Sequence, residues 1–394
     1  MAVRRRPWLS VQPTIAEVLR DVQASRVDTE EVWVSACDAE HSVHGTLSCK
    51  RTGDDVDLVA TAPWHAERTA NADVWDVSTK GDVCVHAQVH VPRVQHAWKG
   101  AYAPLVLDLG VSAAGTERWA IGGAEGQLYA GEWHGGTEAQ AVPSIVCAGH
   151  VSDVTSVRFF PSGEVLLSTS LDMHARIFSA LDGTCPRTLQ GHTRAIVGSA
   201  ILGRGRQVAT GSADHTVRVW DVGRGTTVQV WTRDEPVAAL GAYGAVDATP
   251  EVPTGALLAG SASGVAAWDV REAPGAAWTL ALPSEAQNVS ALCAYDVSVW
   301  VGTHDGAVAV YDVRAPATPV EAWRRSRARI TDLWLDAHGA LIATSDGQPY
   351  AVNAGRGEAV RELAGWDATS TSAVRRDAQG HVIVGGPEGW AWYA

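Results

Sequence analysis

Apolar and polar residues alternate in short runs along most of the chain, and such runs are typical of β-strands with one buried face. Near the N-terminus the pattern occupies the segments 31–51 and 72–98. In the second segment the apolar positions repeat at a period of two, as Val83, Val85, Ala87, Val89 and Val91. We therefore predict short strands or hairpins in both segments, with the acidic stretch 51–57 forming a turn.

One segment, 14–25, has the spacing of an amphipathic helix instead. Thr14 is placed to cap its N-terminus, and Glu17 is placed to reach back to the Thr14 amide. The apolar stripe of this helix consists of Ile15, Val18, Leu19 and Val22. The stripe fits packing within the chain, with docking of a partner as the alternative. Together with the short strands, this helix forms an N-terminal region that we place at 1–80.

The middle of the chain repeats itself with a period of 42 residues. Gly149-His150 returns as Gly191-His192, and an Asp lies 22 residues after each His. The copies close on Phe178-Ser179 and Trp220-Asp221. A unit of this length that opens on Gly-His and closes on an aromatic-Asp pair is a WD repeat, one four-stranded blade of a β-propeller. Because blades do not occur singly, the flanking chain must supply others.

Five further blades can be placed with this period, at 105–146, 235–280, 289–323, 330–363 and after Trp366. The last of them shows only three strands. We expect a strand from the start of the chain, near 83–94, to close the ring, because closure removes exposed sheet edges. The predicted fold class is therefore all-β, a seven-bladed WD-repeat propeller at 81–394. Eight blades would require the N-terminal hairpins to form another.

The composition narrows the kinds of partner. The net charge is −13, with 44 acidic against 31 basic residues, which argues against nucleic-acid binding because that affinity comes from Lys and Arg neutralising phosphates. A basic protein partner fits better. No apolar stretch is long enough to cross a membrane, and the six cysteines lack paired spacing, as expected of free thiols in a reducing compartment. We expect a monomeric cytoplasmic protein, with the nucleus as a second location.

The repeated polar residues resemble a catalytic Ser-His-Asp set, but their spacing follows the repeat. We interpret them as structural hydrogen-bonded chains within each blade. The chains comprise His150, Ser170 and Asp172 in one copy and His192, Ser212, Asp214 and Trp220 in the other. Elsewhere the sequence has no phosphate-binding loop, nucleophile elbow or set of metal ligands. It thus predicts no enzyme, no cofactor and no metal site.

A further short motif gives an alternative function. Trp268-Asp269-Val270-Arg271 fits the WDxR pattern associated with substrate receptors of cullin-type ubiquitin ligases. Because Arg often follows the third strand of a blade by chance, the motif supports that function only as the second choice, beside that of a general WD-repeat scaffold.

Several segments, in order along the chain, resemble the proteasomal ATPase-associated factor family. They are 33–35, 45–49, 154–163, 191–192, 203–206, 302–306 and 312–316. The resemblance implies a WD-repeat chaperone for assembly of the proteasome regulatory particle. It further implies binding to the C-terminal domain of an ATPase subunit of the base, which would block premature docking on the core particle until assembly displaces the chaperone.

On this interpretation the partner meets the propeller face that carries the inner turns and the blade-to-blade loops. The candidate contacts are the non-scaffold positions Asp153, Leu171, Arg194, Glu235, His304, Trp366 and Asp367. Trp366 is the strongest anchor because Trp is over-represented at interface hot spots, with packing between blades as its alternative role. An acidic propeller facing a basic domain would gain association rate and selectivity from charge complementarity.

Overall fold

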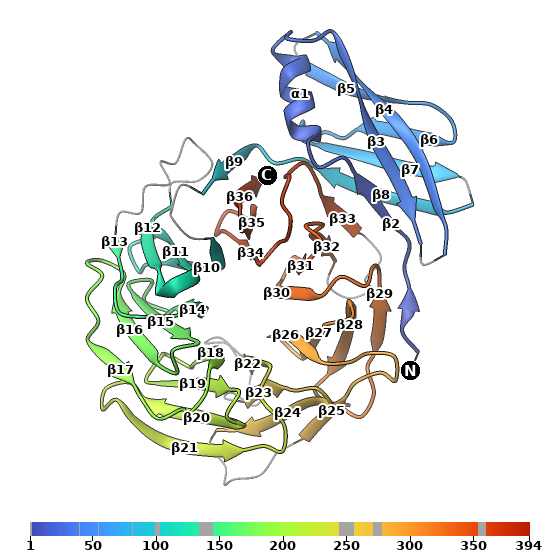
Figure 1. The fold of residues 1–394 in the computed structure, drawn as a ribbon. Coiled ribbons are helices and arrows are strands. Elements are labelled where there is room, and N and C mark those ends of the chain that lie inside the picture. The colour runs from blue at the N-terminus through green and yellow to red at the C-terminus, as the bar shows by residue number, and fades with distance from the viewer. Residues whose placement is uncertain are drawn as a thin grey trace.

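The structure is a computed structural model of the 394-residue chain, and it shows a ring of β-sheets with a smaller domain on its rim (Figure 1). It describes residues 2–38, 40–53, 55–80, 82–98, 103–133, 145–243, 256–270, 278–353 and 360–394. Within these residues seven four-stranded units are arranged in a ring. The predicted fold class, an all-β WD-repeat propeller, is confirmed.

The first four blades are consecutive antiparallel sheets. Blade one contains β10 (Pro104–Val111), β11 (Glu117–Gly123), the 3-10 helix η1 (Ala124–Gly126), β12 (Leu128–Glu132) and β13 (Ile145–Val146). Blade two contains β14 (Val154–Phe159), β15 (Val165–Ser170), β16 (Ala175–Ser179) and β17 (Arg187–Leu189). Blade three contains β18 (Ile196–Leu202), β19 (Gln207–Ser212), β20 (Thr216–Asp221) and β21 (Thr226–Thr232). Blade four contains β22 (Ala239–Tyr243), β23 (Ala256–Gly260), β24 (Gly264–Asp269) and β25 (Trp278–Ala281).

The remaining blades each recruit chain from the N-terminal part. Blade five contains β26 (Val289–Tyr295), β27 (Ser298–Thr303), β28 (Ala307–Asp312) and β29 (Glu321–Arg324), beside which lies β1 (Arg4–Arg5). Blade six contains β30 (Ile330–Asp336), β31 (Gly339–Thr344), β32 (Tyr350–Val352) and β33 (Val360–Leu363). Blade seven contains β34 (Ala373–Arg376), β35 (Val382–Gly386) and β36 (Gly389–Tyr393), completed by β9 (Val94–Ala97).

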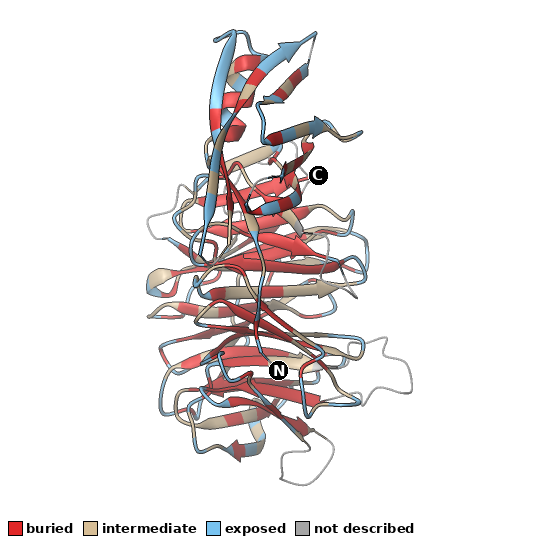
Figure 2. Cartoon of the chain, turned by 90° about the vertical axis from the view of Figure 1, so that its right-hand side faces the viewer, coloured by how far each residue is buried: buried red, intermediate tan, exposed pale blue. Residues whose placement is uncertain are grey.

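Burial follows the position of a strand within its blade. The second strands are buried on both faces because neighbouring blades pack against each other there; β23 and β31 have no exposed residue. The fourth strands alternate between the interior and water, as in β21. Figure 2 shows this layering, with buried segments running through the ring. The apolar alternation in the sequence therefore marks the outer strands best.

Polar side chains on the innermost strands join one blade to the next. The Thr155 hydroxyl donates to the Ile196 carbonyl at 2.8 Å, and the Ser290 hydroxyl donates to the Ile330 carbonyl at 2.6 Å. Each bond satisfies a carbonyl at the start of the following inner strand. The same arrangement joins Thr331 to the Thr371 carbonyl at 2.6 Å. These bonds hold neighbouring blades together at their innermost strands.

Ring closure differs from the expectation that a strand near 83–94 completes the last blade. The strand that pairs with β36 is β9, antiparallel, with Ala391 opposite Gln95. The strand β8 (Cys84–His90) pairs instead in parallel with β33 of blade six. The alternating residues of β8 are buried in the core of the small domain, whereas β9 has only four residues, VQHA, which is too short for a periodic signal. The boundary between the two parts thus lies after β8 and not at residue 80.

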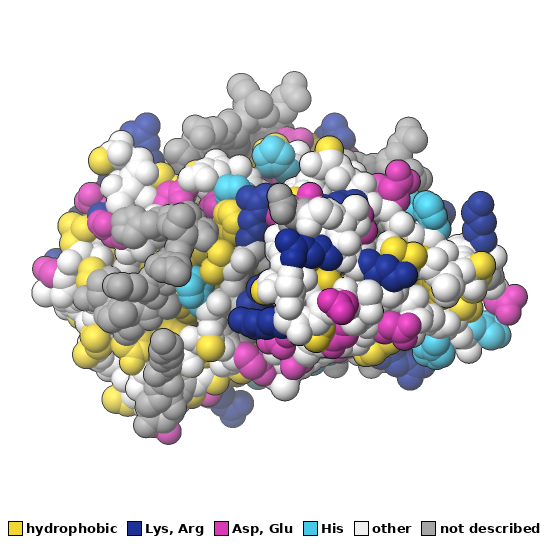
Figure 3. All heavy atoms as spheres, turned by 90° about the horizontal axis from the view of Figure 1, so that it is seen from above, with side chains coloured by type: hydrophobic (Ala, Val, Ile, Leu, Met, Phe, Trp, Pro, Cys, Tyr) yellow, Lys and Arg dark blue, Asp and Glu magenta, His cyan; other side chains and the backbone are white. Residues whose placement is uncertain are grey.

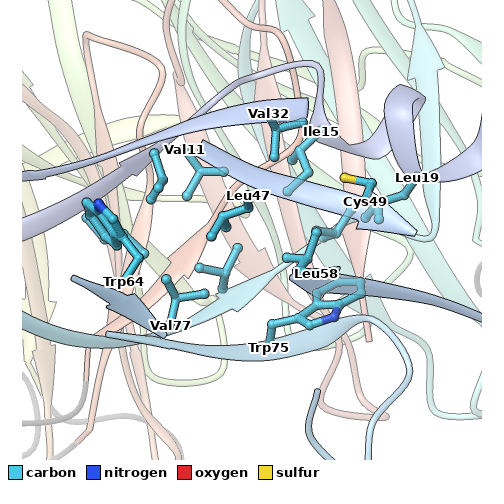
Figure 4. Close-up of a cluster of buried hydrophobic side chains, with 14 of the residues drawn as sticks. Val11, Ile15, Leu19, Val32, Leu47, Cys49, Leu58, Trp64, Trp75 and Val77 are labelled. Atoms are coloured by element: carbon cyan, nitrogen blue, oxygen red, sulfur yellow. The ribbon is translucent and has the colours of Figure 1, made fainter. Parts of the chain in front are cut away.

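The small domain encloses its own core between two sheets. One sheet contains β2 (Trp8–Val11), β3 (Thr29–Cys37), β4 (Ser42–Thr52) and β5 (Asp55–Ala60). The other contains β6 (Trp64–Arg68), β7 (Val74–Lys80) and β8. Figure 4 shows side chains from both sheets and from α1 (Ile15–Gln23) meeting between them. The predicted turn at 51–57 is instead largely strand, because β4 extends to Thr52 and β5 begins at Asp55.

The helix α1 packs inside the molecule. Ile15, Val18, Leu19 and Val22 are all buried in the core of the small domain. The stripe is therefore a packing face and is not available to a partner. Thr14 does not cap the helix through its side chain. Its hydroxyl instead accepts a hydrogen bond from the side-chain amide Nε2 of Gln12 at 2.8 Å.

The surface of the small domain mixes both signs of charge. Seen from above in Figure 3, its Lys and Arg side chains lie among Asp and Glu. Examples are the ion pairs of Arg26 with Asp21 at 2.7 Å and of Arg68 with Asp55 at 3.0 Å. The acidic residues of this region therefore do not form a continuous negative patch.

A buried carboxylate of blade six, Glu362, links the small domain to the ring. Arg325, in the loop between blades five and six, places both Glu362 carboxylate oxygens within 2.9 Å of its Nη2. Glu362 also accepts the Leu9 amide of β2 at 3.3 Å, and Ser10 accepts the Gln348 side-chain amide at 3.1 Å. With the β8–β33 pairing, these bonds extend blade six into a seven-stranded sheet across both parts. The propeller and the small domain are thus one hydrogen-bonded structure.

Candidate protein-interaction surface

The polar residues of blade three form a continuous hydrogen-bonded chain. His192 Nδ1 lies 2.8 Å from the Asp214 carboxylate, and its Nε2 lies 2.8 Å from the Thr210 hydroxyl. Because a carboxylate only accepts, Nδ1 carries the proton and Nε2 accepts from Thr210. The Thr210 oxygen in turn accepts the Trp220 indole N–H at 2.8 Å. Every member therefore has a partner, as a buried polar chain requires.

The charges of this chain support the same assignment. Burial disfavours the Asp214 carboxylate, but hydrogen bonds from Thr216, Thr193 and His192 outweigh burial and hold the pKa of this carboxyl below its usual value. Burial lowers the pKa of His192 more than Asp214 raises it. The ring is consequently neutral at pH 7, with neither nitrogen free to take a proton from a substrate.

The serines predicted in these chains lie two residues away from the hydroxyls that contact the histidines. Ser212 donates to the Ala195 carbonyl at 2.8 Å, and Ser170 donates to the Ser152 carbonyl at 2.8 Å. The partner of His150 is Ser168, at 2.8 Å, and that of His192 is Thr210. Residues two apart share a strand face, so the sequence pattern cannot distinguish them.

Replacing Thr210 by valine is expected to lower the free energy of unfolding by about 2–5 kcal/mol, because His192 Nε2 and Trp220 Nε1 both lose their partner inside the blade. Ser168→Ala in blade two is the matched change. It leaves only His150 Nε2 without a partner, because His150 Nδ1 keeps its bond to Asp172 and Phe178 has no N–H, and should cost about 1–2 kcal/mol. Urea unfolding of the two variants tests this order; equal losses would contradict the role of Trp220.

Each of these sets of a His, an Asp, a hydroxyl residue and an aromatic residue is called here a tetrad. The loops and turns that hold the tetrads define one face of the ring, called here the tetrad face. It comprises the turns between second and third strands and the loops from one blade to the next. Its apolar part is a patch of three exposed side chains on blade two: Val151 at 81%, Leu171 at 43% and Met173 at 41% exposure. The Leu171 amide donates to the Asp153 carbonyl at 3.0 Å, which holds the turn against the loop. We call these three residues the blade-two patch.

Only one member of the blade-two patch, Leu171, was predicted. Val151 follows a repeat histidine and Met173 follows a repeat aspartate, and neither was among the predicted contacts. The sequence did contain a signal for Val151 and Met173. An apolar residue beside a motif residue in a polar turn has no packing role, which indicates an exposed contact residue. At Met173 the backbone φ is +68°, as at His215 of the next blade at +69°. The left-handed turn points these side chains out of the blade.

Apart from Trp366, the remaining predicted contacts divide into two groups. Arg194, His304 and Asp367 are exposed on the tetrad face. Asp153 and Glu235 are half-buried, and each carboxylate accepts a backbone amide of the neighbouring blade's turn at 3.0 Å, from Glu125 and Ser263 respectively. They therefore support the face as well as line it.

Trp366 lies in the interior instead. Only 8% of it is exposed, and it packs with Leu341, Leu363 and Tyr393 in the core between blades six and seven. The packing role that competed with the anchor role is the one that the structure shows. Trp366 is therefore removed from the candidate contacts.

Free charges on the tetrad face carry both signs. Within the described residues, the exposed acids without an ion pair are Glu125, Asp234, Glu285, Asp346 and Asp367. The basic ones are Arg194, Arg327 and Arg329. Burial lowers the pKa of His304, and the nearby Arg329 adds to this effect, so the imidazole is neutral at pH 7. A partner therefore meets an apolar patch framed by alternating charges.

The other predictions concern the WDxR pattern, metal sites and membrane spans. Arg271, the arginine of the WDxR pattern, lies outside the described residues, whereas Trp268 is buried and stacks on Trp231 with ring centroids 5.6 Å apart.

In the described part of the chain, no group of three or more His, Cys, Asp or Glu side chains is arranged to hold a metal ion. None of the described helices is both long and apolar enough to cross a membrane.

Comparison with known proteins agrees with the repeat architecture. Residues 142–179 and 183–221 match the WD domain, G-beta repeat. The chain is 32% identical over 217 residues to the 26S proteasome regulatory subunit RPN14 of Saccharomyces cerevisiae, a match covering 50% of this chain and 52% of that protein. It is 23% identical over 208 residues to the eukaryotic translation initiation factor 3 subunit I of Drosophila melanogaster, covering 51% of this chain and 63% of that protein.

The corresponding initiation-factor subunit of Saccharomyces cerevisiae is 34% identical over 94 residues, covering 24% of this chain and 27% of that protein. The matches thus span from about a quarter to under two thirds of each relative's length. The chain is a WD-repeat propeller that, over half its length, is similar to a regulatory subunit of the 26S proteasome.

Proposed function

We propose that this protein is an assembly chaperone of the proteasome regulatory particle. It binds the C-terminal domain of an ATPase subunit of the base and prevents premature association of that subunit with the core particle. The observation that carries the proposal is the 32% identity to a 26S proteasome regulatory subunit over 217 residues. As a monomer in the cytoplasm and nucleus, it would meet ATPase subunits before they assemble.

The blade-two patch supplies the anchor for this contact. Val151, Leu171 and Met173 expose apolar surface on loops that the tetrad of blade two holds in place. Apolar side chains at the centre of an interface, surrounded by polar groups, are the usual site of its strongest contacts. The free carboxylates of Glu125 and Asp234 on neighbouring loops favour a basic partner.

The mechanism is steric occupancy. A ring of seven blades presents a broad rigid surface, and a partner domain seated on the tetrad face cannot use the covered surface for another contact. No chemical step is needed, which agrees with tetrad histidines whose nitrogens are both hydrogen-bonded. Release requires only that assembly offers the ATPase subunit a more favourable set of contacts.

The double variant Val151→Asp, Leu171→Asp is expected to weaken binding to the ATPase C-terminal domain by at least tenfold, because it places charges in the apolar centre of the interface. Leu181→Asp is the matched control: Leu181 is 53% exposed on the same blade, in the turn between third and fourth strands at the opposite face. Binding is measured by isothermal titration with purified ATPase C-terminal domains. Unchanged affinity of the double variant, or an equal loss with Leu181→Asp, would contradict the assigned face.

A pull-down from cell extract distinguishes this function from its alternatives. Recovery of free ATPase subunits without the core particle supports the chaperone. Recovery of a cullin adaptor that is lost in Arg271→Ala would establish the ligase receptor instead, as the WDxR pattern suggests. Recovery of other initiation factor 3 subunits would favour the function named for the second set of relatives.

A further inference from the structure

The face opposite the tetrad face carries a cleft of a different chemical character. Two adjoining cavities, of about 450 Å³ and 440 Å³, share Tyr295, Asp336 and Ala337 in their walls. The first opens where the turns between first and second strands of blades one, five, six and seven converge. The second continues between blades five and six toward Trp300 and Val320. Together they form one continuous cleft, called here the turn-face cleft.

The walls of this cleft are rich in aromatic side chains. Tyr295 stands at the junction of the two cavities and is 43% exposed, while Trp133 and Trp334 line the first cavity and Trp300 the second. Within the described residues the buried indole N–H groups of Trp133 and Trp334 have no hydrogen-bond acceptor. Trp133 is only 8% exposed, so an unpaired donor there lacks water as well. A peptide carbonyl entering the cleft could accept from it.

The basic side chains in the cleft are already neutralised. Arg376 contacts the Asp336 carboxylate at 2.7 Å and the Gly380 carbonyl at 3.0 Å. Arg314 pairs with Asp312 at 2.5 Å. Similarly, Arg118 lies 3.6 Å from the Glu132 carboxylate and donates to the Gly163 carbonyl at 3.2 Å.

The acidic side chains are in surplus. Asp377 pairs with His381 at 2.9 Å, but Glu117 and Asp296 form no ion pair within the described residues. Burial raises the pKa of the Glu117 carboxyl, and the nearby Asp377 carboxylate raises it further. A cation placed beside Glu117 would relieve this repulsion. The ring of Tyr295 in the same cleft, 43% exposed, offers contact area for an apolar side chain.

We propose that the turn-face cleft binds an extended segment of a partner protein that places a Lys or Arg side chain beside Glu117 and an apolar side chain against Tyr295. The cleft thereby gives the molecule a second docking surface, on the face turned away from the one proposed for the ATPase subunit. The charge balance selects the basic segment over an acidic one. The unpaired Trp133 N–H selects a peptide over a purely apolar ligand.

Two synthetic hexapeptide mixtures test this assignment. Both have randomised positions around one fixed residue, Arg in the first and Glu in the second, and retention on the immobilised full-length protein is measured by mass spectrometry. We expect the Arg mixture to be retained about tenfold more than the Glu mixture, with apolar residues enriched next to the Arg. Equal retention of the two mixtures, or preference for Glu, overturns the proposal.

Variants locate the binding in the cleft. Tyr295→Ala and Glu117→Gln should each reduce retention of the Arg mixture about fivefold, and Ala337→Arg should abolish it by filling the junction of the cavities. Unfolding midpoints equal to that of the unmodified protein show that these variants fold. The tetrad-face variant Leu171→Asp should leave retention unchanged, which separates this site from the proposed ATPase contact. Retention that survives Tyr295→Ala and Ala337→Arg overturns the proposal.

Discussion

Replacing Gly389 by alanine is expected to break the closure of the ring and to lower the free energy of unfolding by about 3–5 kcal/mol. A Cβ at this position would collide with the His96 carbonyl of β9 and would lie 2.9 Å from the Trp98 amide. The backbone φ of Gly389 is +141°, which adds strain for any L-residue. The collision falls on the strand pair that joins the first and last parts of the chain.

Gly380 provides the control for this prediction. It lies in the same blade with a φ of +93°, but a Cβ there would meet nothing within 4 Å. Gly380→Ala should therefore cost only the backbone strain, about 1–2 kcal/mol. Chemical unfolding measures both variants, and hydrogen exchange of the β9 and β36 amides shows whether Gly389→Ala opens the ring. Slow exchange in these strands would contradict the prediction.

Replacing Arg375 by methionine should destabilise the ring by about 3–5 kcal/mol, because it removes one partner of a buried ion network. Arg375 in β34 contacts Asp108 of blade one at 2.9 Å and Asp332 of blade six at 2.5 Å. Burial alone would lower the pKa of the Arg375 guanidinium, but the two carboxylates raise it above its usual value. Methionine preserves most of the side-chain volume and leaves two acids without their cation.

Arg158→Met is the matched control for the network. Arg158 also approaches Asp108, at 4.0 Å, but its side chain is 34% exposed. A pair that is partly open to water contributes about 1 kcal/mol or less. Adding Asp108→Asn and Asp332→Asn to Arg375→Met should recover part of the lost stability, measured as the midpoint of urea unfolding. The Arg375 guanidinium also lies over the Trp334 ring, 5.1 Å from its centroid. No recovery would mean that the loss comes from this contact rather than from the buried carboxylates.

The strands of the ring were predictable to within a few residues. Blade five was expected at 289–323 and contains strands from Val289 to Arg324, and blade six was expected at 330–363 and contains strands from Ile330 to Leu363. The reason is physical: each blade must bury both faces, so a fixed repeat length brings apolar runs and turns back at the same offsets. Ring closure was not predictable in this way, because β9 is only four residues long and has no alternating pattern of apolar and polar residues.

The candidate site was predictable only in part. The repeat spacing indicated a structural role for His192 and Asp214, and it placed Leu171 and Arg194 on the tetrad face. It could not show that Trp366 is buried, because a Trp after an outer strand can pack inward or outward. Nor could it find the turn-face cleft, whose walls come from blades one, five, six and seven.

The sequence by itself determined the fold class, the number of blades and the scaffold role of the repeated polar residues. These properties depend on local periodicity and on spacing within one repeat, and both can be identified in the sequence itself. The tertiary structure alone decided which strand closes the ring, how the small domain joins blade six, and which hydroxyl meets each histidine. Those contacts join residues that are distant in sequence or that share one strand face, so they depend on geometry that no local pattern records.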